Sequence, residues 1–212
     1  MKNIITLLLF TFVPASMALS KTLENQNSMG LGMAKPDFYN KSTLYFYSPN
    51  LDKSPDDHTS VDSLVFKQTE IGYSISYAPP WFFPVHLKMD YEILYMKVIS
   101  IRHDWMLVEV NRQTHLTYWI AKNAVTFIDW PSFLLKVNSV EPISSQNTLK
   151  QKPLPNASEF TSSQIAFLRP VAVRDQWLQV DVLDNNYKVI AKGIWLRWRN
   201  VDQLLITYSL LS

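Results

Sequence analysis

A gap-free internal repeat is the feature of the sequence that most constrains the fold. Residues 93–110 and 165–182 align at a constant offset of 72 positions. They share five identical pairs, namely Ile93/Ile165, Arg102/Arg174, Trp105/Trp177, Val108/Val180 and Val110/Val182. The similarity continues at an offset of 76, where Trp119-Ile120 and Val125 correspond to Trp195-Leu196 and Val201. A recurrence of this length predicts two copies of one structural unit.

Each copy has the residue pattern of β-strands. From Leu64 onward, Val, Ile, Tyr, Phe, Trp and Leu dominate short runs, and apolar and polar residues alternate in 107–110 and 180–182. No stretch keeps the spacing of an amphipathic helix over a dozen residues, and 12 prolines are spread through the chain. The sequence therefore predicts an all-β protein. A unit of about 70 to 90 residues with five or six short strands closes most economically as a small barrel, which leaves no free edge.

The repeated unit resembles the bacterial SH3-like domain. The resemblance covers about residues 73–129 and 148–206, and it rests on three matching elements in each copy. In the first copy these are an opening strand and loop at Ile75–Pro79, a central strand at Trp105–Val108 and a closing element at Trp119–Val125. In the second they are Leu149–Pro155, Trp177–Val180 and Gly193–Val201. The first copy departs from the family pattern, since it has no glycine before Trp119 or after Val110.

This resemblance implies two tandem SH3-like barrels, over residues 37–135 and 136–212. The link around residues 130–138 is short and apolar, so we expect the barrels to pack against each other. In this family such domains are binding or targeting modules, often for cell-wall peptides in secreted proteins, and are not catalysts in themselves. The resemblance thus implies a cell-wall fragment or an extended peptide as the ligand. The alternative is a structural subunit that docks another envelope protein.

The N-terminus has the three-part pattern of a secretory signal. Lys2 precedes an apolar run from Ile4 to Val13, and Ser16-Met17-Ala18 places small residues before a cleavage point. The run is about half the length needed to span a bilayer. We therefore expect residues 1–18 to be removed and the protein to be exported to the periplasm or the cell exterior, with no integral membrane segment in the mature chain. Residues 19–36 show no periodicity and predict a flexible arm.

Composition argues against several classes of function. Only four glycines occur, too few for the clustered glycines of a dinucleotide fold or a P-loop. Cysteine is absent, which excludes disulfides and thiolate chemistry. Twenty basic residues against 18 acidic ones give no electrostatic signature for nucleic acid. The four histidines are His58, His86, His103 and His115, and they lack the spacing of a metal site. We therefore expect no metal, no cofactor and no enzymatic activity.

Aromatic residues provide the candidate ligand site. The segment Pro79–Pro84 contains three consecutive aromatic residues that have no counterpart in the second copy, so it is not required to build a barrel. We predict a ligand groove on the first barrel formed by Tyr77, Trp81 and Phe82. Trp198 lies between two arginines, and is predicted to face outward as a weaker candidate. The alternative is that the aromatic segment packs between the barrels or caps the end of the first barrel. Two strand carboxylates are predicted to face solvent: Glu109 and Asp181.

Overall fold

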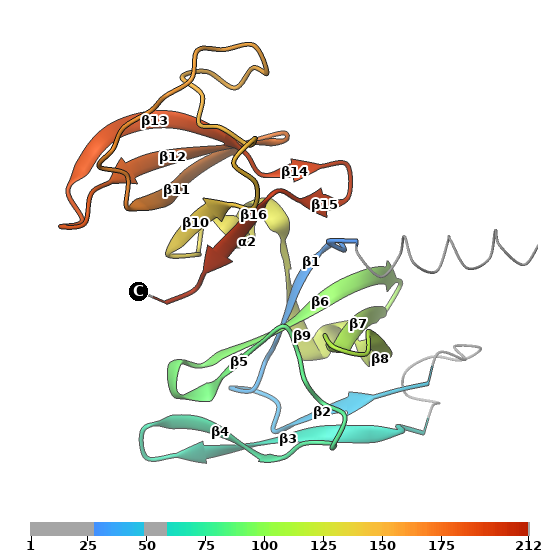
Figure 1. Ribbon diagram of the computed structural model, residues 1–212. Helices are drawn as coiled ribbons and strands as arrows, with labels where there is room; N and C mark the ends of the chain where they lie inside the picture. The colour runs from blue at the N-terminus through green and yellow to red at the C-terminus, as the bar shows by residue number, and fades with distance from the viewer. Residues whose placement is uncertain (1–27, 49–58, 212) are drawn as a thin grey trace, which may run out of the picture.

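The computed structural model describes residues 28–48 and 59–211 (Figure 1). This part of the chain consists mostly of antiparallel strands with almost no helix, so the prediction of an all-β protein is confirmed. The predicted signal peptide and residues 19–27 of the arm lie outside the described residues. Among the residues that are described, no helix is long and apolar enough to cross a membrane.

The first half of the structure, residues 28–129, contains two antiparallel sheets. The larger has the strand order β8-β7-β6-β1-β9, and β5 pairs with the N-terminal part of β6. Its strands are β1 (Gly32–Pro36), β5 (His86–Lys88), β6 (Ile93–Arg102), β7 (Trp105–Asn111), β8 (Leu116–Ala121) and β9 (Val125–Asp129). The smaller sheet has the order β2-β3-β4, with β2 (Thr43–Phe46), β3 (Asp62–Thr69) and β4 (Gly72–Tyr77). Two 3-10 helices connect strands: η2 (Met89–Tyr91) and η3 (Lys122–Ala124).

The second half begins with the helix α2 (Trp130–Leu134), which Asp129 caps by accepting a hydrogen bond from the Ser132 amide. It contains a five-stranded sheet of order β13-β12-β11-β10-β16 and a two-stranded ribbon. The sheet is built from β10 (Ser139–Pro142), β11 (Phe167–Arg174), β12 (Trp177–Leu183), β13 (Val189–Arg197) and β16 (Ile206–Ser209). The ribbon pairs β14 (Arg199–Asn200) with β15 (Gln203–Leu204).

The two large sheets have equivalent strand orders. In each, the first strand lies between the last strand and a three-stranded meander, as β1 does between β9 and β6 and β10 does between β16 and β11. The repeated hairpins also share their register, which pairs Arg102 with Trp105 in one and Arg174 with Trp177 in the other. A register shift interrupts both hairpins at the same repeat position: Val98/Ser100 and Pro170/Ala172.

A second shared feature closes each unit on the far side of its meander. In the first half, Tyr47 and Trp119 exchange backbone hydrogen bonds of 2.9 and 3.1 Å. In the second, Lys150 and Trp195 exchange two bonds of 2.8 Å. In each half, therefore, the segment that follows the first strand crosses to the edge of the meander and pairs with it.

The structure corrects the predicted position of the opening strands. The sequence placed them at Ile75–Pro79 and Leu149–Pro155, but the first strands of the two sheets are β1 and β10. Ile75 lies in β4 of the separate small sheet. Consequently the prediction of a flexible arm over 19–36 is wrong for residues 32–36. Met33 is buried there, and Gly32 allows a close approach, because a Cβ at that position would lie 2.3 Å from the Ile128 carbonyl oxygen.

Two apolar cores stabilise the molecule. One fills the first half, where Phe46, Leu64, Met96 and Ile120 are fully or almost fully buried. The other belongs mainly to the second half but also includes four buried residues that precede α2 or begin it: Met29, Met33, Ile128 and Trp130. The second core therefore contains residues of both halves.

Candidate functional site

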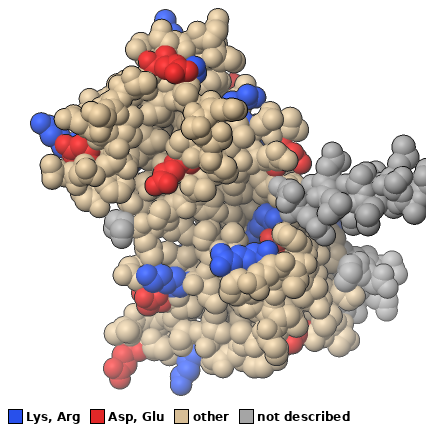
Figure 2. All heavy atoms as spheres, in the orientation of Figure 1, with Lys and Arg blue, Asp and Glu red and all other residues tan. Residues whose placement is uncertain are grey.

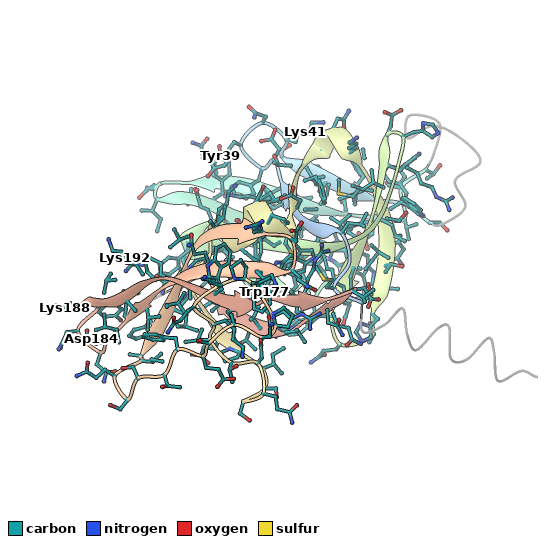
Figure 3. The ribbon with its side chains drawn as sticks, turned by 90° about the horizontal axis from the view of Figure 1, so that it is seen from above. Tyr39, Lys41, Trp177, Asp184, Lys188 and Lys192 are labelled. Carbon is teal, nitrogen blue, oxygen red and sulfur yellow. The ribbon has the colours of Figure 1, made fainter. Side chains whose placement is uncertain are left out.

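The candidate site is a groove in the second half, referred to here as the Trp177 groove. It has a volume of about 550 Å³ and lies between the loop that follows β10 and the β11–β12 turn. Its lining residues are Lys152, Pro153, Leu154, Pro155, Arg174, Asp175, Gln176 and Trp177. In Figure 3, Trp177 lies centrally, whereas Asp184, Lys188 and Lys192 cluster at the far end of the β12–β13 hairpin. That charged end is remote from the groove.

One wall of the groove is a loop fixed at its base. Lys150 pairs with Glu159 both through the backbone and through an ion pair of 3.0 Å between Nζ and Oε1. Thr148 donates a hydrogen bond of 2.8 Å to the same carboxylate oxygen. Both hydrogen bonds lower the pKa of Glu159 below its usual value, and the one from Lys150 has the larger effect. Residues 151–158 therefore project from a defined base and present Leu154 to solvent.

The opposite wall is the β11–β12 turn, which accepts two hydrogen bonds from Trp198. Asp175 has a positive φ of 53°, as the equivalent His103 does in the first half, with 42°. The indole of Trp198 donates a hydrogen bond of 3.0 Å to the Asp175 carbonyl, and its amide donates one to Gln176. Trp198 is only 1% exposed. The prediction that it faces outward is therefore wrong, and its structural role is to position this turn.

The composition of the groove suits an extended peptide. Trp177 forms part of the lining but is only 7% exposed, so most of the apolar surface comes from Pro153, Leu154 and Pro155. Basic and acidic groups both border the groove, because Arg174 and Asp175 lie in the turn and Lys152 in the facing loop. The groove is thus able to contact apolar side chains and both kinds of charged group.

The same position in the first half is arranged differently. Trp105 also begins its strand directly after the hairpin turn, but Tyr47 packs edge-on against it, with ring centroids 4.9 Å apart. The residue in the backbone position equivalent to Tyr47 is Lys150 in the second half. Residues 49–58, which follow Tyr47, lie outside the described part of the chain. The two tryptophans are nonetheless buried to a similar extent, since Trp105 is 6% exposed and Trp177 is 7% exposed.

The three residues predicted to form a groove on the first half are not equally accessible. The Trp81 ring packs against Phe46 and Tyr118, with centroid distances of 5.2 and 4.8 Å. Phe82 is 9% exposed and belongs to the core of the first half. Tyr77 is exposed, and its hydroxyl donates a hydrogen bond of 3.1 Å to Asp62, which raises the Tyr77 pKa. Their role in binding stays a prediction, but the packing favours the alternative in which Trp81 and Phe82 are structural.

Glu109 was also misplaced by the sequence interpretation. It was predicted to face solvent, but it is 6% exposed. Its Oε2 lies 2.9 Å from both Lys97 Nζ and His115 Nδ1. Lys97 faces Glu109 directly across the β6–β7 hairpin. Opposite charges at facing positions of this hairpin could therefore have indicated the ion pair from the sequence. Within residues 28–48 and 59–211, no group of three or more His, Asp or Glu side chains is arranged to hold a metal ion.

Comparison with known proteins identifies no relative. The chain matches no protein-family model, no curated protein and no solved structure.

Proposed function

We propose that the protein is an exported, non-catalytic binding module that holds an extended peptide, or the peptide of a cell-wall fragment, in the Trp177 groove. The observation that carries this proposal is the groove of about 550 Å³ itself, in which the apolar surface of Pro153–Pro155 lies opposite the charged turn residues Arg174 and Asp175.

We further propose that each half is an SH3-like barrel and that the two arose as tandem copies. The equivalent strand orders support this, as do the matching hairpin registers and the register shift at the same repeat position. In SH3-like folds the loop after the opening strand borders the usual peptide groove. Here the loop after β10 supplies Lys152–Pro155, one wall of the Trp177 groove.

The proposal favours ligands that lie extended and carry both apolar and charged groups. Proline-rich or otherwise extended segments bind aromatic-lined grooves at a low entropic cost, because little chain freedom is lost. Arg174 offers a planar, two-pronged donor for a carboxylate, and Asp175 offers an acceptor for an ammonium group. Because Leu154 is exposed at the rim, it is available to contact an apolar side chain.

Retention on purified sacculi tests the proposal. The protein should be retained, free muropeptides should displace it, and the double variant Lys152→Gln, Arg174→Gln should weaken retention about tenfold or more, since charge-assisted hydrogen bonds are lost. The matched control is Arg102→Gln, which alters the equivalent turn position of the first half. Full retention of the double variant would overturn the assignment of the groove. No retention, with recovery of an envelope protein instead, would support a docking subunit.

A further inference from the structure

A second pocket, separate from the Trp177 groove, lies where the two halves meet. This interface pocket has a volume of about 460 Å³. The first half contributes residues 83–88, Ile93 and Arg112, and the second half contributes residues 208–211. In Figure 1 the C-terminal end of the chain and β5 lie on the same side of the molecule. The pocket therefore exists only when both halves are folded and in contact.

Most of the pocket wall is apolar. Leu87 and Phe83 line it from the first half and are both exposed, and Leu210 and Leu211 line it from the second. Its volume is within the range of pockets that hold small ligands. Exposed apolar side chains that converge on one concavity, unlike those scattered singly, indicate a surface that a ligand covers.

The charged residues of the pocket are both cationic. Arg112 lies over the Phe83 ring, with 4.6 Å between its guanidinium carbon and the ring centroid, and Lys88 lies 4.2 Å from the centroid of Tyr91. No Asp or Glu is among the residues that line the pocket. In the described part of the chain, no carboxylate forms an ion pair with either cation. Figure 2 shows basic and acidic groups interspersed over the visible face.

The inner wall of the pocket is uncharged at neutral pH. His86 Nε2 lies 2.9 Å from the Tyr208 hydroxyl, and burial, with a smaller contribution from Arg112, lowers the His86 pKa to about 4. Burial also raises the pKa of Tyr208. The imidazole and the phenol are therefore both neutral, and one hydrogen bond joins them. Among the described residues that line the pocket, Arg112 and Lys88 therefore carry the net charge.

We propose that the interface pocket binds a long-chain carboxylate, a free fatty acid, with its carboxylate at Arg112 and its chain along the apolar wall. The planar guanidinium can donate two parallel hydrogen bonds to a carboxylate, and Lys88 adds a second positive charge near the same opening. A neutral or cationic amphiphile would bury the same apolar surface but would leave both cations uncompensated.

Calorimetric titration of the purified protein with decanoate, below its micellar concentration, tests this proposal. Decanoate should bind at one site, while acetate, decanol and decyltrimethylammonium should bind at least tenfold more weakly, because each lacks either the chain or the negative charge. Equal binding of decyltrimethylammonium would overturn the proposal, since apolar contact alone would then explain the affinity. Absence of decanoate binding would overturn it as well.

Variants locate the site. Arg112→Gln should weaken decanoate binding about tenfold or more, and Leu87→Ser should weaken it by a smaller factor through lost apolar contact. Arg174→Gln, in the Trp177 groove, is the matched control and should leave the affinity unchanged. Decanoate should also raise the melting temperature of the unaltered protein but not of Arg112→Gln, because a ligand held by both halves stabilises the folded state. Unchanged affinity in Arg112→Gln would refute the assignment.

Discussion

His86 makes the folded protein sensitive to acid. Its imidazole lies between the halves, against Phe133 and Tyr208, and its pKa in the folded state is about 4 rather than 6.5. Below pH 6.5 the unfolded chain binds a proton at this residue that the folded chain does not, so stability falls as the pH falls. The decrease continues down to about pH 4, where the folded state becomes protonated as well.

The size of this effect follows from the two pKa values. A difference of about 2.5 pH units corresponds to at most ~3.4 kcal/mol, of which about 2 kcal/mol is lost by pH 5 and about 3 kcal/mol by pH 4. Such a loss is a large fraction of the stability of an ordinary domain, about 5 to 15 kcal/mol.

Denaturant unfolding at a series of pH values measures the effect. The free energy of unfolding of His86→Gln should fall less steeply between pH 6.5 and pH 4 than that of the unaltered protein, by about 3 kcal/mol in total. His103→Asn is the control, because His103 is exposed in the β6–β7 turn at a positive φ that asparagine tolerates. Carboxylates titrate in all three proteins, so the difference isolates His86. Parallel pH profiles for His86→Gln and the unaltered protein would refute the reasoning.

Four further substitutions test the packing. Phe82→Ala should destabilise the first half by about 3 to 5 kcal/mol, measured from the denaturant midpoint; a change below about 1 kcal/mol would return Phe82 to the candidate ligand surface. Glu109→Ala should cost about 3 kcal/mol, because it leaves the Lys97 side chain, which is 13% exposed, without its carboxylate partner. Asp181→Ala should lower the melting temperature little. Gly32→Ala should prevent normal pairing of β1, seen as faster amide exchange in β9, since its Cβ would meet the Ile128 carbonyl.

The strands of the repeated hairpins could be predicted because they are seven to ten residues long, rich in β-branched and aromatic residues, and alternate in part, as in 107–110 and 180–182. The opening strands β1 and β10 could not, since they have only five and four residues and their positions are fixed by distant partners. The burial of Trp198 could have been predicted from the sequence. Ile194, Leu196 and Trp198 follow the period of two that puts buried residues on one face, but the flanking arginines suggested exposure instead.

The Trp177 groove could not be located from the sequence. Its two walls are separated along the chain by the whole region between Pro155 and Arg174, and only the fold brings them together. The aromatic segment around Trp81 was predicted to bind a ligand because its three consecutive aromatic residues occur in only one copy of the repeat. Burial of Phe82 shows that an unusual composition also arises where an inserted segment must cover a core.

The position of β1 also governs the order in which the first half can form. Gly32 pairs with Asp129, 97 positions later (129 − 32), and with Val98 on the other side. A chain made from its N-terminus therefore cannot complete this sheet until β9 has been synthesised, and loop closure over such a separation delays folding. Until then β6 and β9 lack the strand that lies between them. The strand made first in this sheet is therefore among the last to be paired on both sides.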